Sequence, residues 1–374
     1  MRNNNPSMLS LFRSRHPQDE MPTCNDRIRG FWEWFQQVAP EFRRTINEGG
    51  CDDLAEPTSA KVSECFPGFA WVYGPPSEGK VGHSFTLSGE GVECRQLLAL
   101  HWLQQAPEID GWSFHASRQP GPISGHVITM AGMKFDPKEI WVTPSVDVDG
   151  ERVDLTVWHP AWPDLEKRQK WRVVFLFLDE VLGEYGTGWW IGEIRLENDR
   201  LRDSFPLEEL GEYVRQLSAA KGWKKFPPGV EYSLLKIKPS DEVYPRSDLL
   251  TLTTAAPDLF RDHREAKGEL EDPFAGTGAD YVYVSFDKNL LTVGNEVEER
   301  GELEDLLDGV LKSRRSGQCV GGGFGLRRGY VDLLIFDGKR SMDLIVGALR
   351  GSRFAKGASI EYFAKEKRKQ AVRL

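Results

Sequence analysis

The sequence predicts an α+β protein: a multi-stranded, mostly antiparallel sheet with helices, followed by a ferredoxin-like (βαββαβ) C-terminal domain. Three observations predict it. Short runs rich in β-branched and aromatic residues are interrupted by segments whose apolar residues recur at helical spacing. Several links between the strand-like runs have hairpin length and contain Gly, Pro or Asp. From Ala279 onward the elements follow the order strand, helix, strand, strand, helix, strand.

The length and the charge of the chain limit the number of domains and the class of partner. At 374 residues the chain is longer than one core usually supports, so two domains are expected. The net charge is −9, and it is unevenly spread: residues 280–374 hold 17 Lys and Arg against 14 Asp and Glu, while the remainder holds 31 against 43. The acidic remainder should repel nucleic acid, and only the C-terminal part could tolerate it.

The first elements follow a polar N-terminus. A helix capped by Asn25 or Asp26 is expected to run to about Ile46, with Pro40 kinking or splitting it and Gly49-Gly50 ending it. A hairpin-like pair of strands and a further helix follow, at 69–73, 83–87 and 92–105. Four more strands are predicted, at 112–117, 126–130, 140–143 and 153–158.

The most apolar helical pattern spans Asp164–Tyr185 and should lie against a sheet. Gly186-Thr-Gly188 is expected to end it, and a strand at 189–196 and a helix at 206–220 complete the first domain. The predicted organisation is a disordered tail (1–24), an N-terminal α+β domain (25–225), connecting strands, helix and linker (226–278), the ferredoxin-like domain (279–364) and a basic tail (365–374).

In the ferredoxin-like domain, strands are expected at 281–286, 317–323, 330–336 and 359–363, and helices at 296–313 and 340–349. The glycine-rich stretch before Tyr330 lacks the Lys and Ser/Thr of a phosphate loop, so it is interpreted as the turn of a hairpin. Its residues are the predicted contacts to a ligand or partner: Gly321, Gly322, Gly323, Gly325, Arg327, Arg328, Tyr330 and Asp332.

The same strands raise an RNA-binding alternative, because RNA-recognition modules stack bases on strand aromatics. Tyr283 and Tyr330 stand where such aromatics would be. Asp332 shares the face of Tyr330, however, and its carboxylate would repel phosphate. The favoured interpretation is that the aromatic face packs on the preceding domain, through Tyr281, Tyr283, Tyr330, Leu334 and Phe336.

Catalytic and metal signatures are incomplete. Glu180 and Glu184 are spaced to share a helical face near Asp179, and with His159 and Glu193 they could serve as acid, base or metal ligands. A solvent-facing helix side is the simpler interpretation. The seven histidines form no metal-binding pattern, although three of them could converge from strands: His83, His115 and His126. No catalytic residue, metal or cofactor is therefore predicted.

The five cysteines form no CxxC pair, which is typical of reduced thiols in the cytoplasm. No segment has the length or apolar character of a signal peptide or membrane span. Phe31-Trp-Glu-Trp-Phe35, Phe69–Gly74, the helix at Val174–Tyr185 and the Gly321–Phe336 stretch together resemble bacterial families described as domains of unknown function. This resemblance implies no chemistry and no functional residue.

The predicted function is therefore a soluble cytoplasmic, non-catalytic binding or regulatory module with a protein partner, no membrane contact and an oligomeric state that the sequence leaves open. The first alternative is a hydrolytic or metal-dependent enzyme that uses scattered His and carboxylate side chains. The second is RNA binding through the C-terminal sheet, although the charge distribution disfavours nucleic acid as a partner.

Overall fold

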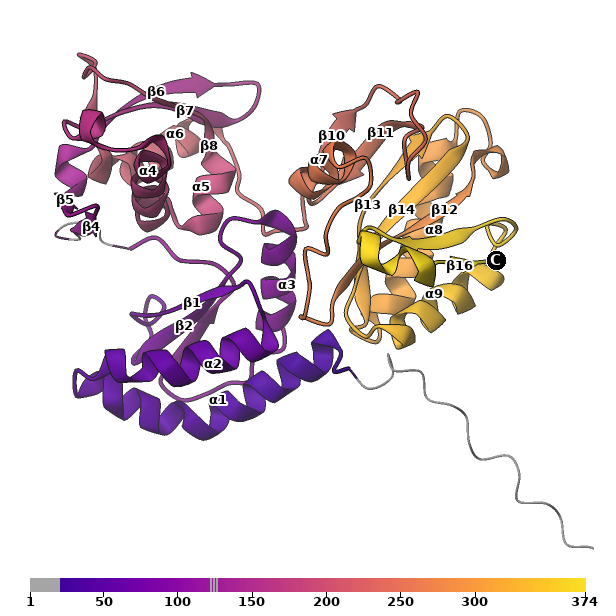
Figure 1. The fold of residues 1–374 in the computed structure, drawn as a ribbon, viewed down its shortest axis with the longest axis horizontal. Helices are drawn as coiled ribbons and strands as arrows, with labels where there is room; N and C mark the ends of the chain where they lie inside the picture. The colour runs from indigo at the N-terminus through magenta and orange to yellow at the C-terminus, as the bar shows by residue number, and fades with distance from the viewer. Residues whose placement is uncertain (1–20, 122, 124, 126) are drawn as a thin grey trace, which may run out of the picture. The chain divides into compact units, whose positions relative to one another are not determined.

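The computed structural model describes residues 21–121, 123, 125 and 127–374, and over these the chain is α+β, as predicted (Figure 1). The expected tail at 1–24 therefore falls almost entirely outside the described residues, as do His16 and His126. The chain forms two compact units. Over the described residues, the C-terminal unit consists of residues 21–30, Lys236–Leu252 and His263–Leu374; the N-terminal unit consists of Phe31–Leu235 and Thr253–Asp262.

The first part of the N-terminal unit is built around a three-stranded sheet. Its elements are α1 (Cys24–Asn47, which begins in the other unit), η2 (Cys51–Leu54), α2 (Ala55–Cys65), β1 (Ala70–Gly74), β2 (His83–Ser88), α3 (Glu93–Leu103) and β3 (Trp112–His115). β1 pairs antiparallel with β2, and β2 runs parallel to β3. Phe31 and Phe35 of α1 pack on Phe85 of β2 with ring centroids 5.4–5.6 Å apart.

Two expectations about these helices are corrected. α1 continues through Pro40 as one helix, so the predicted split is wrong. α2 was not expected, because its sequence is polar and only Thr58, Val62 and Cys65 are buried on one side. In Figure 1, α1 and α2 lie together against β1 and β2. The aromatic residues of α1 thus find their partners on the small sheet.

The second part of the N-terminal unit has a four-stranded sheet in the order β8-β7-β6-β9 and a separate β4-β5 hairpin. Its elements are β4 (Ile128–Met130), β5 (Met133–Phe135), η3 (Pro137–Glu139), β6 (Trp141–Asp147), β7 (Arg152–Trp158), η4 (Trp162–Asp164), α4 (Lys167–Leu182), α5 (Glu184–Trp190), β8 (Ile191–Leu196), β9 (Phe205–Pro206), η5 (Leu207–Glu209) and α6 (Leu210–Lys221). The apolar face of α4 packs in the same core as Val142, Val153 and Leu155 of the sheet, as expected.

The predicted helix Asp164–Tyr185 is two helices. α4 ends at Leu182, because Gly183 adopts φ +75° and breaks the helix. Gly186 and Gly188 lie inside α5 and do not end a helix. Glu180 and Glu184 are therefore on different helices, and the expectation that they share one solvent-facing side is wrong.

The C-terminal unit contains a seven-stranded sheet in the order β10-β11-β13-β14-β12-β15-β16. Its elements are β10 (Ser233–Lys236), β11 (Leu249–Thr254), α7 (Pro257–Glu265), β12 (Asp280–Asp287), η6 (Lys288–Leu290), α8 (Glu296–Lys312), β13 (Gly317–Gly325), β14 (Arg328–Ile335), α9 (Lys339–Arg350), β15 (Ser359–Tyr362), η7 (Lys365–Gln370) and β16 (Val372–Arg373). The divisions between the units fall inside β10, β11 and α7.

The element order predicted from Ala279 is observed, with β12, α8, β13, β14, α9 and β15 in sequence. α8 and α9 share one apolar core with a face of the sheet, through residues such as Leu307, Ile345 and Val284. The sheet continues beyond the four predicted strands on both sides. The ferredoxin-like assignment of this run stays a prediction.

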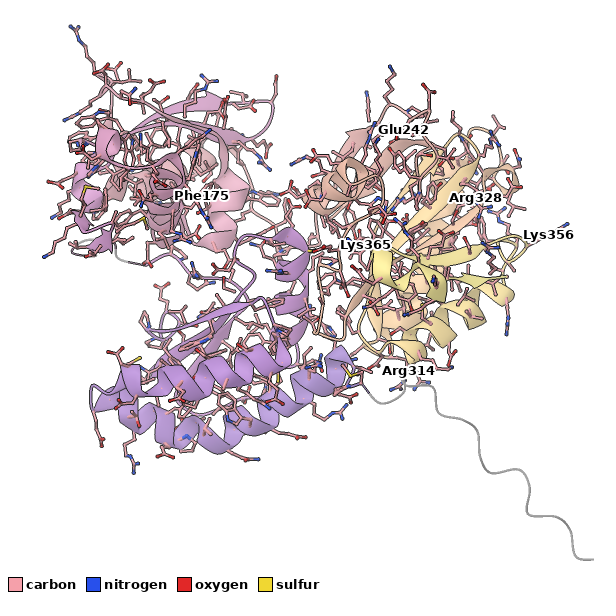
Figure 2. All side chains as sticks on the ribbon, viewed as in Figure 1. Phe175, Glu242, Arg314, Arg328, Lys356 and Lys365 are labelled. Atoms are coloured by element: carbon pink, nitrogen blue, oxygen red, sulfur yellow. The ribbon has the colours of Figure 1, made fainter. Side chains whose placement is uncertain are left out.

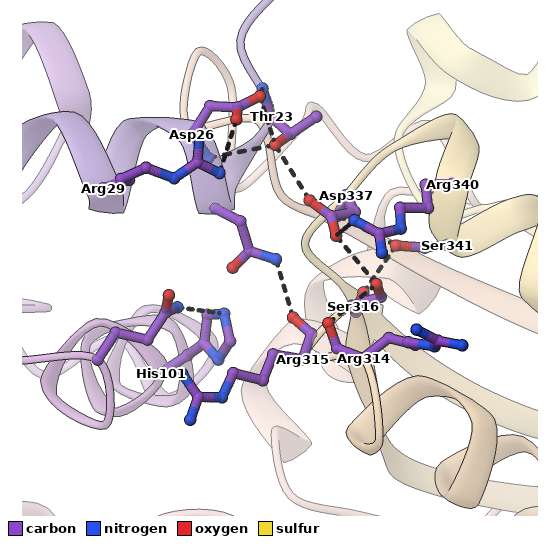
Figure 3. A network of polar contacts seen from close by, with 12 residues as sticks. Thr23, Asp26, Arg29, His101, Arg314, Arg315, Ser316, Asp337, Arg340 and Ser341 are labelled. Atoms are coloured by element: carbon purple, nitrogen blue, oxygen red, sulfur yellow. Dashed lines mark hydrogen bonds and ion pairs between the residues drawn. The ribbon is translucent and has the colours of Figure 1, made fainter.

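The start of α1 belongs to the C-terminal unit, and a polar network holds it there (Figure 3). The Thr23 and Asp26 side chains each accept a hydrogen bond from the other's backbone N–H, both 3.2 Å long. Thr23, and not the expected Asn25 or Asp26, is therefore the capping residue. The Thr23 hydroxyl also donates to Asp337 at 3.2 Å, and Asp337 accepts from the Ser316 hydroxyl at 2.9 Å.

Across the part of the chain that the structure describes, every helix is too short or too polar to cross a lipid bilayer.

Candidate functional site

The glycine-rich stretch is a strand. Gly321, Gly322, Gly323 and Gly325 lie within β13, and the connection to β14 consists of Leu326 and Arg327. The interpretation of these glycines as a hairpin turn is therefore wrong. β13 lies between β11 and β14, so its backbone has a neighbouring strand on both sides.

Close approach of neighbouring groups explains the glycines. A Cβ atom at Gly323 would lie 2.3 Å from the backbone oxygen of Thr251, and one at Gly322 would lie 2.6 Å from Glu304 Oε1. Because real Cβ atoms do not approach other atoms so closely, any side chain here would push the neighbouring groups apart. The run is a packing feature of the sheet.

Of the eight predicted contact residues, six are buried: the four glycines, Tyr330 and Asp332. Arg327 is exposed. Arg328 is half-buried, and it donates from Nε to the Ser285 hydroxyl and from Nη2 to the Ser285 carbonyl oxygen, both at 2.8 Å (Figure 2). Of the eight predicted residues, only Arg327 and part of Arg328 are therefore accessible to a partner in the folded state.

The buried polar residues of this sheet converge on Arg246. Its guanidinium donates to the carboxylate of Asp332 at 2.8 Å, and both side chains are only 1% exposed. The same guanidinium lies 5.0 Å from the ring centroid of Tyr283, 4.8 Å from that of Tyr330 and 5.3 Å from that of Phe363. We call Arg246, Asp332, Tyr283, Tyr330 and Phe363 the arginine cage.

Carboxylates and a histidine surround the arginine cage. The Tyr283 hydroxyl donates to Glu361 at 2.7 Å, and the Tyr330 hydroxyl donates to Asp248 at 2.6 Å. The His263 ring packs against Phe363, with ring centroids 4.8 Å apart and the two planes tilted by 53°. Burial, together with the nearby charges of Arg246 and Arg368, lowers the pKa of His263 to about 3, so this imidazole is neutral near pH 7.

The protonation of the central pair follows from its surroundings. Burial raises the pKa of Asp332, while the guanidinium of Arg246 opposes that shift. Burial lowers the pKa of Arg246, but Asp332 and the neighbouring tyrosines outweigh it, so the net pKa is raised. A buried guanidinium keeps its charge and needs a counter-ion within bonding distance.

The arginine cage bears on the RNA alternative. Tyr283 and Tyr330 are 2% and 4% exposed, and a cation already covers both rings. A base could stack on them only after Arg246 had left its buried position. All the named members of the aromatic face are buried: Tyr281, Tyr283, Tyr330, Leu334 and Phe336. Its packing on the preceding domain stays a prediction.

The basic tail at 365–374, expected to extend into solvent as chain ends commonly do, is instead folded into the C-terminal unit as η7 and β16, so that expectation is wrong. Lys365 pairs with Glu271 at 3.4 Å, and Lys367 pairs with Asp272 at 2.7 Å and with Asp280 (Figure 2). We call residues 268–280 the acidic connector. Its carboxylates neutralise the positive charge of the tail, and both the acidic and the basic residues can be recognised in the sequence.

The carboxylates considered as acid, base or metal ligands have partners separate from those of His159. Glu184 is buried and accepts hydrogen bonds from several groups of the N-terminal unit. Glu193 is exposed and pairs with Arg195 at 2.6 Å. His159 packs between Phe135 and Trp162, and burial lowers its pKa to about 4. No contact brings these three together in the described chain.

The remaining histidines are also dispersed. His83 Nε2 lies 2.9 Å from Asn47 Oδ1, and His115 Nε2 lies 3.4 Å from the hydroxyl of Ser77. Burial and Lys80 lower the pKa of His115. Over the described ranges, no group of three or more His, Cys, Asp or Glu side chains is arranged to hold a metal ion.

One sheet edge of the N-terminal unit lacks the usual protection. β1 is the terminal strand of the β1-β2-β3 sheet, and among the described residues no strand pairs with its outer side. Its sequence, Ala-Trp-Val-Tyr-Gly, has no charge and no proline, and Val72 is 40% exposed. By contrast β8, a terminal strand of the four-stranded sheet, carries Glu193 and Arg195.

Sequence reasoning missed Arg246, Asp248 and His263, all from the segment predicted as a connection. The available signal was Asp332, a lone carboxylate in the apolar run Tyr330–Phe336. A buried carboxylate requires a cation partner, but nothing local identifies which one. Comparison of the chain with known family models, with curated proteins and with solved structures yields no match.

Proposed function

We propose that the chain is a non-catalytic protein-binding module of the cytoplasm, in which β1 accepts an extended segment of a partner by strand addition. The carrying observation is the uncharged outer edge of Ala70–Gly74. An unpaired strand edge presents a row of backbone N–H and C=O groups that a second strand can satisfy.

The side chains of β1 define the partner's chemistry. Trp71 and Tyr73 have ring contacts with Phe85 of β2, which hold the strand in place. Val72 is the exposed member of the strand, so a partner strand with β-branched or aromatic residues would complement it. Backbone hydrogen bonds then supply affinity, and the contact at Val72 supplies selectivity.

Selection of displayed ten-residue peptides on the full chain tests this function. Selected peptides should slow hydrogen exchange at residues 70–74 and should bind Val72→Lys about tenfold or more weakly, since a strand-edge lysine disfavours pairing. Val148→Lys is the matched control, because Val148 is 55% exposed in the β6–β7 turn of the same unit. Failure to select any peptide, or equal binding by the parent and Val72→Lys, would refute strand addition.

A second candidate function, hydrolysis, has one specific observation in its favour. The Ser77 hydroxyl lies 3.4 Å from His115 Nε2, within the reach of a nucleophile and its base in an unliganded site. A fluorophosphonate probe distinguishes the candidates. Hydrolysis requires covalent labelling at Ser77 that is lost in Ser77→Ala and His115→Asn, whereas a binding module leaves Ser77 unlabelled.

A further inference from the structure

The buried carboxylate of Glu184 is a meeting point within the N-terminal unit. Its Oε2 accepts from the Ser88 hydroxyl at 2.7 Å and from the Arg118 backbone N–H at 3.2 Å. Its Oε1 accepts from the Gly91 backbone N–H at 2.9 Å and from the Gln96 side-chain amide at 3.4 Å. Glu184 is only 2% exposed.

These donors come from segments distant in sequence from Glu184. Ser88 ends β2, Gly91 lies in the turn that leads to α3, and Gln96 is on α3. Arg118 follows β3. Glu184 is the first residue of α5, directly after the break at Gly183. One carboxylate therefore ties the β2–α3 turn and the segment after β3 to the junction of α4 and α5.

Backbone contacts reinforce the same junction. The Glu184 N–H donates to the Arg118 carbonyl oxygen at 3.0 Å, and the Gly121 N–H donates to the Glu180 carbonyl oxygen at 2.8 Å. A Cβ at Gly183 would lie 2.9 Å from the Arg118 carbonyl oxygen, so the two segments meet closely. The contact between the segment after β3 and the α4–α5 junction therefore depends on a small number of polar groups.

Further charged side chains lie near the α4–α5 junction. The Arg118 guanidinium pairs with Glu90 and lies 3.9 Å from the carboxylate of Asp179, near the end of α4. The charged groups acting on Asp179 are thus Arg118 and Glu90 from the facing segments and Glu184 from α5. Two carboxylates, those of Glu90 and Asp179, share the Arg118 guanidinium, and the Asp179 side chain is 20% exposed.

We propose that Glu184 and its four donors form an interlock between the β2–α3 turn, the segment after β3 and the α4–α5 junction, and that ionisation of Asp179 loosens it. The device is independent of strand addition at β1. Water reaches the Asp179 carboxylate when the junction opens, so the charged form favours the open state.

The direction of the pH effect follows from the position of Asp179. The pKa of Asp179 is raised to about 6. Burial is the main cause of this net shift, the Thr187 hydrogen bond and Arg118 oppose it, and Glu184 and Glu90 contribute to it. A carboxyl group whose pKa is raised in the closed state binds its proton more tightly there. The interlock is therefore tightest below pH 4, weakens as the pH rises, and reaches its weakest state once the pH has passed about 6.

Hydrogen exchange of the full chain between pH 4 and pH 7, corrected for intrinsic exchange rates, tests the proposal. The amides of Gly91, Arg118 and Glu184 should lose protection by a factor on the order of 100, about tenfold for each unit of pKa shift. The Leu207 amide, bonded to Ile140 at 2.8 Å in the same unit, provides the internal reference and should not follow this trend.

Two variants separate the contribution of Asp179 from that of Glu184. Asp179→Asn should abolish the pH dependence of the three amides, and Glu33→Gln, at an exposed position of α1, should retain it. Glu184→Gln should lower their protection at every pH, because the amide cannot accept from four donors. A flat profile in the parent chain, or an unchanged pH dependence in Asp179→Asn, would overturn the proposal even if Glu184→Gln does not fold.

Discussion

Removal of the Asp332 charge should destabilise the C-terminal unit severely. In Asp332→Asn the side chain keeps its shape, but the guanidinium of Arg246 is left in the core without a counter-ion. Both side chains are 1% exposed, so water cannot replace the lost partner. Breaking a buried pair by removing one member costs about 3–5 kcal/mol. That is a large share of the roughly 5–15 kcal/mol that stabilises a typical domain.

The distribution of aromatic residues makes the measurement specific. All twelve tryptophans lie between Trp32 and Trp223, in the N-terminal unit, so tryptophan fluorescence reports only on that unit. Hydrogen exchange of β12 and β14 reports on the C-terminal unit. We expect protection of these strands to fall by about 10²- to 10⁴-fold, the equivalent of the lost free energy.

Two comparisons sharpen the test. Asp343→Asn removes an exposed carboxylate that pairs with Lys339 at 2.6 Å on α9 and should cost less than about 1 kcal/mol. Replacing both charges, as Arg246→Met with Asp332→Leu, should restore most of the stability, because no unpaired charge remains. If Asp332→Asn stays within about 1 kcal/mol of the parent, or if the double variant is no better than the single one, our account of the arginine cage is wrong.

Three further predictions concern the same unit. Gly323→Ala should cost more than about 2 kcal/mol in urea unfolding, since its Cβ meets the backbone of Thr251, whereas Gly347→Ala, in open space on α9, should be neutral or stabilising. Protection of the unit should fall as the pH drops from about 6.5 towards 3, because the buried imidazole of His263 must stay neutral while the unfolded chain takes up the proton; His263→Phe should remove this slope. Lys367→Met should increase hydrogen exchange in the acidic connector, and unchanged exchange there would contradict its role.

Much of the secondary structure could be predicted because it depends on local patterns. The sequence alone predicted both the helical periodicity of α4 and the order of elements from Ala279. The exceptions had local causes that compete with periodicity. α2 is too polar to be recognised, and Gly183 breaks a run whose apolar spacing suggested a single helix.

The candidate sites depended far more on tertiary structure. The composition of the Gly321–Phe336 stretch predicts a turn followed by a strand, and Asp332 requires a cation partner only if its carboxylate is buried. Neither could identify Arg246, which is 86 residues away along the chain. Likewise nothing near Glu184 names Ser88 or Gly91 as its donors. Backbone preferences act over a few residues, so they can be predicted from the local sequence. The partner of a buried charge is decided only when distant segments pack together.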